Sequence, residues 1–282
     1  MKILVTGGAG AVGANLIEKL LELGHDVTSW DNYSVGRSKN HIEGAEYVRL
    51  DTRNSEIAFK GQFDLVYHLG EYSKVVPSFD EINKAWDYNI KGSYELIKMC
   101  SDYNTPLVYA GSSTRLSHPG ELHSPYAFFK STIAKLIQGF GDWYGLKYNI
   151  CYFYNVYGPK TDLWDREWQS VINIFIEQKK ENIPLTITGD GTQKRDFTHV
   201  DDIVDGLVLA GENICNTEFQ LGTGVEYSIL ELAALFDHPF EFIPARPGDR
   251  PRGLADIEYT QKTLGYNPKY NLKDYINGYN FV

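Results

Sequence analysis

Cysteine is scarce, and its three occurrences form no recognisable framework. Cys100, Cys151 and Cys215 are odd in number and widely separated in a chain of 282 residues. This spacing argues against a disulfide-stabilised fold of the secreted type, and it offers no C-x-x-C pair for a metal or a redox centre. We therefore expect the protein to work in a reducing compartment, the cytoplasm.

Long apolar runs and an excess of positive charge are also missing. No stretch approaches the roughly 20 apolar residues of a membrane span, and the short N-terminal apolar run leads into a glycine turn rather than a signal-peptide pattern. Lysine and arginine total 27 against 37 acidic residues, which gives a formal charge of −10. This balance argues against nucleic acid or an anionic membrane as a partner, so any phosphate-binding site has to be local.

Several catalytic motifs are absent as well. The seven histidines show neither H-E-x-x-H nor any paired-ligand spacing, and no G-K-[ST] phosphate loop occurs. The segment AGSSTR lacks the second glycine of a nucleophile elbow. We therefore expect no metal centre, and the sequence argues against a kinase or an esterase.

What the sequence does contain is an alternation of strand-like and helix-like segments. The strand-like runs are KILVT, DVTSW, EYVRL, DLVYHL, PLVYAG and YNICYF. Their rhythm predicts an α/β fold with a Rossmann-like, doubly wound parallel sheet. After NVYGP the pattern changes to a helix-like VINIFIEQKK, a strand-like LTIT and a helix-like VDDIVDGLVLA. We expect a nucleotide-binding domain over residues 1–158, regained over about 196–224, and a smaller substrate-binding lobe over 159–195 and 225–282.

A glycine turn follows the first predicted strand and opens the first predicted helix. The stretch VTGGAGAVG can be aligned as G-x-G-x-x-G from Gly8 or as G-x-x-G-x-x-G from Gly7. In either register the backbone lets a pyrophosphate approach the helix N-terminus closely. Asp31 follows the second predicted strand about 20 residues later, where a carboxylate accepts ribose hydroxyls and repels a 2′-phosphate. These features predict NAD rather than NADP.

The segment SPYAFFK places Tyr126 and Lys130 four residues apart on one predicted helix face. Ser124 is a good N-cap, and Pro125 suits the first helical position. The same spacing recurs elsewhere, at Tyr94 and Lys98, but that pair precedes the fifth predicted strand and is interpreted as a solvated helix surface. Tyr126 instead comes after the hydroxyl cluster that closes PLVYAG, near the expected nicotinamide position.

Many short signatures together carry a family resemblance that spans nearly the whole chain. They are TGGAGAVG, DNYSVGR, DTR, HLGEY, NIKGS, SPYAFFK, NVYGP, GDGTQKRDFTHVDDIV, LGTG and RPGD. In these motifs the sequence resembles the extended short-chain dehydrogenase/reductase family, in its nucleotide-sugar epimerase and dehydratase branch. The resemblance favours the register of Gly7, Gly10 and Gly13.

The resemblance implies roles for the residues in these motifs. Tyr126 would be the catalytic base, Lys130 would lower its pKa and hold the nicotinamide ribose, and Ser112 would meet the sugar oxygen, with Ser113 or Thr114 as alternatives. The phenol pKa of about 10 has to fall by roughly 3 units for a base that acts near neutrality. The implied NAD-binding residues are Gly7, Gly10, Ala11, Val12, Gly13, Asp31, Asn32, Asp51, Thr52, Leu69, Gly70, Tyr126 and Lys130.

The same resemblance implies substrate contacts. Asn155, Arg195 and Arg246 would hold a nucleotide diphosphate, because arginine binds phosphate oxygens bidentately. Asp249 would lie near the nucleoside, and Ser112 and Ser113 near the sugar. Arg250 and Arg252 either add to this cluster or form surface ion pairs in a solvated loop. His68 is expected to be a core or supporting residue rather than a catalyst.

The choice of reaction rests on the residues directly after the hydroxyl of Ser112. Dehydratase and decarboxylase relatives carry acidic residues there, whereas this chain has Ser113, Thr114 and Arg115. The sequence therefore favours C4 epimerisation of a UDP-hexose or, because Gly253 replaces a bulky residue, of a UDP-N-acetylhexosamine. The alternatives are an NAD(P)H-dependent 4-ketosugar reductase, a 4,6-dehydratase and, more distantly, a non-catalytic nucleotide-binding regulator.

Two further expectations come from the resemblance. Relatives dimerise through helices that correspond here to about 82–103 and 126–140, so a homodimer is expected. The loop RLSHPGELH, residues 115–123, is shorter than in most relatives and normally helps to shape the sugar pocket. The identity of the nucleotide and the sugar therefore stays open.

Overall fold

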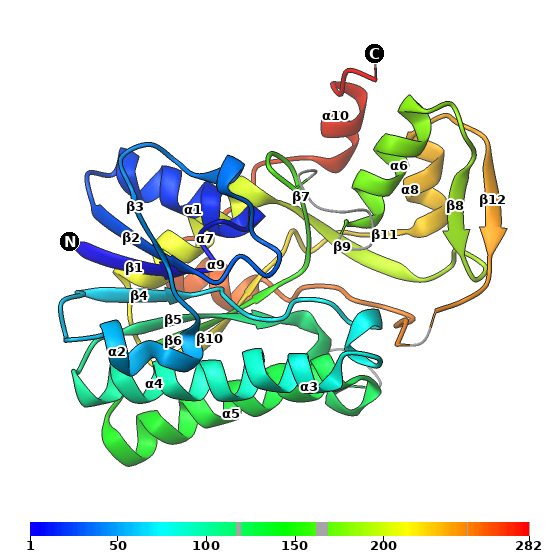
Figure 1. The fold of residues 1–282 in the computed structure, drawn as a ribbon. Helices are drawn as coiled ribbons and strands as arrows, with labels where there is room; N and C mark the ends of the chain where they lie inside the picture. Colours follow the sequence, from blue (N-terminus) through cyan, green and yellow to red (C-terminus); the bar gives the residue numbers. More distant parts are fainter. Residues whose placement is uncertain (117–119, 162–168, 247, 282) are drawn as a thin grey trace.

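The computed structural model describes residues 1–116, 120–161, 169–246 and 248–281. Its centre is a seven-stranded parallel sheet (Figure 1). In spatial order its strands are β10 (Thr217–Leu221), β6 (Tyr148–Phe153), β5 (Leu107–Ser112), β4 (Leu65–His68), β1 (Lys2–Thr6), β2 (Asp26–Asp31) and β3 (Glu46–Arg49). The predicted Rossmann-like sheet is confirmed.

The middle strands are buried on both faces, which is why they read as continuous apolar runs rather than as alternating patterns. Thr6 at the end of β1 pairs with His68 of β4, and His68 pairs with Tyr109 of β5. The chain winds in opposite directions on the two sides of β1, toward β2 and toward β4. A ligand crevice is expected at such a switch point, beyond the carboxyl ends of the strands.

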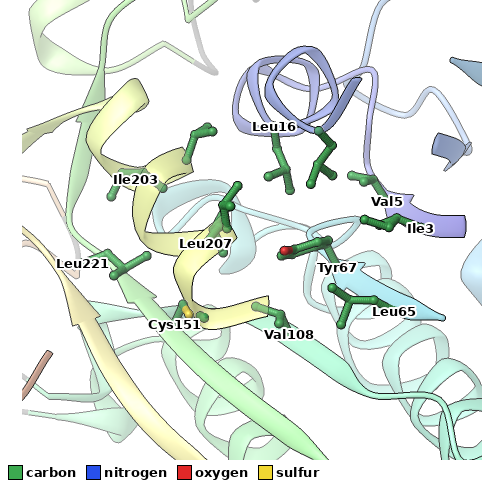
Figure 2. Close-up of a cluster of buried hydrophobic side chains, with 14 of the residues drawn as sticks. Ile3, Val5, Leu16, Leu65, Tyr67, Val108, Cys151, Ile203, Leu207 and Leu221 are labelled. Atoms are coloured by element: carbon green, nitrogen blue, oxygen red, sulfur yellow. The ribbon is translucent and has the colours of Figure 1, made fainter. Parts of the chain in front are cut away.

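Helices cover both faces of this sheet (Figure 1). One layer is α1 (Ala11–Glu22), α7 (Val200–Glu212) and α9 (Glu258–Leu264); the other is α2 (Ser55–Ala58), α3 (Ile82–Ala85), the π-helix η4 (Trp86–Gly92), α4 (Ser93–Asp102) and α5 (Pro125–Tyr144). Figure 2 shows the core under the first layer, where Leu16 of α1 and Leu207 of α7 lie above Tyr67 of β4. Segments from both ends of the chain therefore build one core.

A smaller lobe lies beyond the end of the main sheet (Figure 1). It contains α6 (Val171–Lys180), β8 (Leu185–Thr188), α8 (Ile229–Leu235), β12 (Phe240–Ile243) and α10 (Leu272–Asn277). The strands β7 (Asn155–Tyr157), β9 (Lys194–His199) and β11 (Glu226–Ser228) form a three-stranded sheet between the two parts. The lobe has a hydrophobic core of its own, which includes Phe175, Phe197 and Phe236.

Short 3-10 turns connect several of these elements. They are η1 (Ser38–Asn40), η2 (Thr52–Asn54), η3 (Val76–Ser78), η5 (Ser113–Arg115) and η6 (Glu121–His123). Among the described residues, no helix combines the length and apolarity needed to cross a membrane. The same residues contain no group of three or more His, Cys, Asp or Glu side chains arranged to hold a metal ion.

Candidate active site

The glycine turn between β1 and α1 has the geometry of the Gly7, Gly10, Gly13 register. Gly7 has a φ of +72°, and a Cβ there would lie 2.8 Å from the backbone of Gly70. A Cβ at Gly13 would lie 2.2 Å from the carbonyl oxygen of Gly7. Gly10 is the N-cap of α1. Gly8, by contrast, faces Ser29 and Ile17, so it belongs to the packing between the turn and the sheet.

A cavity of about 410 Å³, here called the large cavity, opens beside this turn at the carboxyl ends of β1, β2, β4 and β5. Most of the site residues expected from the sequence line it: Gly7, Gly10, Ala11, Val12, Gly13, Asp31, Leu69, Ser112, Ser113, Tyr126, Lys130 and Asn155. Asn32, Thr52 and Gly70 line a smaller adjoining cavity of about 30 Å³, together with Asp31. Gly7, Asp31, Ser34 and Glu71 line both cavities.

Asp31 is fixed in the cavity wall by two backbone bonds. The N–H groups of Ala9 and Tyr33 donate to its carboxylate over 2.9 and 2.7 Å. Burial raises the pKa of Asp31, and these two hydrogen bonds oppose the rise. A carboxylate held in this way can accept further hydrogen bonds from ribose hydroxyls, so the residue fits the sequence-based choice of NAD.

Asp51, which was expected at the cofactor, is bound by two side chains. Its carboxylate is bound by the Arg53 guanidinium at 2.8 Å and by the Asn32 amide at 2.9 Å. Burial raises the pKa of Asp51, but the hydrogen bonds from Arg53 and Asn32 outweigh it and leave the pKa lowered. Asp51 lines neither the large cavity nor the adjoining one. The structure gives it the role of orienting Asn32.

The predicted start of the long helix is confirmed. Ser124 caps α5 by accepting a hydrogen bond from the Ala127 N–H at 3.1 Å, and Pro125 is its first residue. Both Tyr126 and Lys130 are buried and line the large cavity. The other pair with the same spacing lies on α4, where Lys98 is ion-paired with Asp102 and the tyrosine ring is exposed. That surface interpretation is also confirmed.

The phenol of Tyr126 lies close enough to the hydroxyl of Ser112, at the end of β5, for the two to interact. Thr114 donates to that same serine oxygen over 3.0 Å. Burial raises the pKa of Tyr126 to about 12; the interaction with Ser112 opposes the rise, the charge of Glu71 adds to it, and Arg250 reduces it. The protein groups alone therefore do not lower this pKa. The predicted loop 115–123 cannot be compared in full, because residues 117–119 lie outside the described part of the chain.

Lys130 has a partner that the sequence analysis did not assign. Its ammonium group is ion-paired with Glu71 and donates to the carbonyl oxygen of Ala110. The Glu71 carboxylate also accepts hydrogen bonds from Ser93 at 2.9 Å and from Tyr109 at 3.0 Å. In the sequence, only the position of Glu71 in the motif HLGEY, shortly after the buried strand β4, indicated that this glutamate could lie at the site.

The segment that carries Glu71 is held from both sides. His68 bridges Thr6 at 2.7 Å and Ser93 at 2.8 Å, and burial lowers its pKa to about 4, so it is a neutral core residue, as expected. Asn89, in the π-helix, donates to the carbonyl of Tyr72 and accepts from its N–H. The motif NIKGS thus supports the loop that lines the large cavity.

A second cavity of about 250 Å³, here called the lobe cavity, lies between the main sheet and the smaller lobe. Asn155, Arg195, Arg246 and Asp249, to which the resemblance gave substrate-binding roles, line it together. The guanidinium of Arg195 is 2.7 Å from the Asp249 carboxylate, and it also donates to a backbone carbonyl at 2.6 Å.

Arg250 and Arg252 have different surroundings. Arg250 is 8% exposed and lines both cavities, whereas Arg252 is ion-paired with Glu226 at 2.6 Å on the surface. The alternative of a solvated loop therefore holds for Arg252 and is wrong for Arg250. Burial and the positive charge of the neighbouring Arg195 lower the pKa of Arg250 to about 10. Lys74, whose pKa burial lowers to about 8, is a further cavity residue that the sequence analysis missed.

Comparisons with known proteins agree with this geometry. The model of the NAD dependent epimerase/dehydratase family matches residues 3–222. A UDP-glucose 4-epimerase of Mycolicibacterium smegmatis is 30% identical over 98% of this chain and 96% of that protein. The UDP-glucuronic acid decarboxylase 1 of Arabidopsis thaliana is 28% identical over 97% of this chain and 68% of that protein.

Solved structures give the same result. The crystal structure of UDP-glucose 4-epimerase from Thermotoga maritima, with UDP-glucose, matches with a TM-score of 0.91 at 29% identity, over 97% of this chain and 96% of that one. The predicted family and the predicted cofactor, NAD, are confirmed, while the relatives include more than one reaction. The chain is thus an enzyme of the NAD-dependent epimerase/dehydratase family.

Proposed function

We propose that the protein is an epimerase that inverts C4 of a nucleotide-diphosphate sugar, a UDP-hexose or a UDP-N-acetylhexosamine, through a 4-keto intermediate. One observation carries the proposal: the buried Tyr126 and Ser112 line the large cavity together, and Arg250 and Asn155 line both that cavity and the lobe cavity. A substrate that spans the two cavities would place its sugar beside Tyr126 and its diphosphate beside Arg195 and Arg246.

The residues of the large cavity fit NAD. A Cβ at Gly7 or at Gly13 would fill the space that these glycines leave open in the turn. Asp31 lines the same cavity. We propose that the glycine turn holds the pyrophosphate and Asp31 the adenine ribose, with Lys130 near the nicotinamide ribose. NAD supplies the chemistry of accepting a hydride from the sugar carbon and returning it.

Each protein side chain has a defined task in this scheme. Tyr126 removes the proton of the 4-hydroxyl when the sugar is oxidised and returns it when the ketone is reduced. Ser112 hydrogen-bonds the same sugar oxygen and the phenol. Arg195 and Arg246 hold the diphosphate while the 4-keto sugar turns, so that its other face meets the cofactor.

The surroundings of Ser112 favour epimerisation over elimination or decarboxylation. Dehydration needs an additional acid or base next to the sugar, and the residues after Ser112 are Ser113, Thr114 and Arg115. Arg115 is ion-paired with Glu218 at 2.7 Å on the far edge of the sheet. A carboxylate does lie in the cavity wall, Glu71, but it is already paired with Lys130.

The test is a substrate panel. The purified protein is incubated with UDP-, GDP-, CDP- and dTDP-sugars, and products are separated by chromatography. The proposal predicts that one sugar is converted to its 4-epimer without added reduced cofactor, and that the Tyr126→Phe variant is inactive. A 4-keto-6-deoxy product would identify a dehydratase, and turnover of a 4-keto sugar that consumes added NADH or NADPH would identify a reductase.

We also propose a cytoplasmic homodimer in which each chain has a nucleotide-binding domain, residues 1–158 and about 196–224, and a substrate-binding lobe. Large apolar side chains are exposed along α3, η4, α4 and α5, among them Trp86, Tyr94, Phe128 and Trp143, which supports an interface on this face. Cys100, Cys151 and Cys215 are all free thiols, which suits a reducing compartment. Light scattering of the purified protein tests the dimer.

A further inference from the structure

Two carbonyl oxygens lie against the ring of His123, just before the start of α5. Its Nδ1 is 2.9 Å from the carbonyl oxygen of Gly120, three positions earlier, and its Nε2 is 3.0 Å from that of Gly248, 125 positions later. A carbonyl oxygen only accepts, so a ring nitrogen bonds to it only by donating a proton. A neutral imidazole has one N–H and can therefore hold one of these two carbonyls at a time.

Gly248 belongs to the turn that carries the arginines of the lobe cavity, residues 246 and 248–250, here called the arginine turn. Arg246, Asp249 and Arg250 line that cavity, and the Asp249 N–H donates to the Arg246 carbonyl over 3.4 Å. Arg195 of β9 holds the turn from one side, because it bonds to the Asp249 carboxylate at 2.7 Å and to the Arg250 carbonyl at 2.6 Å. His123 approaches it from another element.

Gly248 is also where the arginine turn contacts the segment that leads to Tyr126. Its φ is +75°, and a Cβ there would lie 2.9 Å from the side chain of Val75. Ser78 donates to the Val75 carbonyl at 2.5 Å and accepts from the Tyr126 N–H at 3.2 Å. His123 stands three positions before Tyr126 in the sequence and reaches the same glycine. One backbone position thus joins the arginine turn to the elements around the tyrosine.

We propose that His123 is a positioning residue: its Nε2–H holds the Gly248 carbonyl and so fixes the arginine turn against the start of α5. The inference rests on the proposed function in that it takes the arginine turn to bind the diphosphate and Tyr126 to meet the sugar. Both groups belong to one substrate molecule. The separation of their two binding sites therefore decides whether C4 lies beside the phenol, and small errors in such a position reduce the rate strongly.

Glutamine and asparagine separate the two contacts of His123. The amide nitrogen of glutamine lies about as far from the backbone as Nε2, and that of asparagine about as far as Nδ1. His123→Gln can therefore still donate to Gly248, whereas His123→Asn can donate only to Gly120, and His123→Leu to neither. His238→Leu is the matched control, because the Nε2 of that histidine also contacts a distant carbonyl, that of Ile183 at 2.9 Å, and His238 lines neither cavity.

Amide hydrogen exchange followed by mass spectrometry measures how firmly the arginine turn is held, without requiring turnover. Peptides that contain residues 248–250 should exchange about 5-fold faster in His123→Leu and His123→Asn than in the wild type, the effect of losing one hydrogen bond of ordinary strength. His123→Gln and His238→Leu should stay within about 2-fold of the wild type. If His123→Leu fails to fold, the comparison of the glutamine and asparagine variants still decides, because both carry the same amide group.

The proposed function adds a second measurement on the same proteins. The kcat for the active nucleotide sugar should fall about 5-fold in His123→Asn and His123→Leu, because the sugar is less often held beside Tyr126. The Kd of the corresponding nucleoside diphosphate, which lacks the sugar, should stay within about 2-fold of the wild type, since Arg195 and Arg246 remain. A merely structural role of His123 would lower the unfolding free energy and leave kcat per folded molecule unchanged.

The inference is overturned if His123→Asn exchanges like His123→Gln, or if His123→Leu exchanges like the wild type. It is equally overturned if glutamine does not restore slow exchange, or if kcat is unchanged in the variants whose arginine turn exchanges faster. Failure of the proposed function would look different. In that case the exchange rates would follow the predicted order, but no sugar of the panel would be epimerised.

Discussion

Two buried cations lie on opposite sides of the cavity system, and their partners differ. Lys130 meets Glu71, whose side chain is 3% exposed, and the pair is closed off by hydrogen bonds from Ser93 and Tyr109. Arg195 meets Asp249, whose side chain is 35% exposed, and the buried Arg250 lies next to it. The first site is balanced in charge, and the second keeps an excess of positive charge that faces the lobe cavity.

The difference suits the two ligands proposed for this acidic protein, the diphosphate of the nucleotide sugar and the nicotinamide end of NAD. A diphosphate brings its own negative charges, so a cavity with excess arginine charge is neutralised when the ligand binds. In the proposed scheme, the end of the large cavity beside Lys130 would receive the positive nicotinamide ring instead. The Glu71 carboxylate, which is ion-paired with Lys130, would then offset the repulsion between the two positive charges.

The largest expected effect removes the phenol and leaves both cation sites intact. Tyr126→Phe should reduce kcat about 10³-fold or more, because the phenol that is proposed to accept the proton is removed. The unfolding free energy and NAD binding should change little, since the ring still fills its place. A steady-state assay and a binding titration check this. Turnover at the wild-type rate would mean that another residue is the base.

Removal of the lysine alone breaks the balanced site. Lys130→Met leaves Glu71 buried without its cation and should lower the free energy of unfolding by about 3–5 kcal/mol. The double variant with Glu71→Gln should recover most of that loss. Urea denaturation followed by circular dichroism measures both. Equal stability of the single and double variants would show that the pair is not coupled.

The pH dependence of stability tests the network behind Glu71. Burial lowers the pKa of His68 to about 4, below its unfolded value near 6.5. Its contribution is therefore complete above about pH 6.5 and is lost as the pH falls toward 4, by about 3 kcal/mol in total. Denaturation curves between about pH 4 and 7 measure this slope, and His68→Gln should flatten it. An unchanged slope in the variant would assign the dependence to other groups.

A smaller stability effect than at Lys130 is expected at the arginine site. Arg195→Gln leaves Asp249 half-exposed, where water can solvate it, so the unfolding free energy should fall by only about 1 kcal/mol. The KM for the nucleotide sugar should nevertheless rise about 10-fold or more, because a phosphate contact is lost. Arg252→Gln, on the surface, is the control and should change neither quantity. A KM unaffected by Arg195→Gln would place the diphosphate elsewhere.

The sequence predicted the part of the site that depends on local patterns. The glycine turn, the capped start of α5 and the strand that ends at Ser112 arise from short-range steric and hydrogen-bonding rules, and the family motifs point to Arg195. These rules act within a few residues of one another, so a single sequence is sufficient to read them.

The features that the sequence did not predict depend on contacts between distant segments. Glu71 and Lys130 are 59 positions apart, and nothing in HLGEY indicates that the carboxylate turns toward α5. The sequence left Arg250 either in the arginine cluster or in a solvated surface loop, and its burial decides for the cluster. Asp51 was expected at the cofactor because of its motif, whereas the hydrogen bond that it accepts from Asn32, 19 positions away, was not predicted.

The central claim is that Tyr126 and Ser112 direct a reversible oxidation at C4 of a nucleotide sugar. The most direct test uses a substrate of the panel labelled with deuterium at C4 and follows the product by mass spectrometry and NMR. The account predicts a 4-epimer that keeps the deuterium at C4, with no net production of reduced cofactor. A product that has lost the label to solvent, or one released together with an equivalent of NADH, would contradict it.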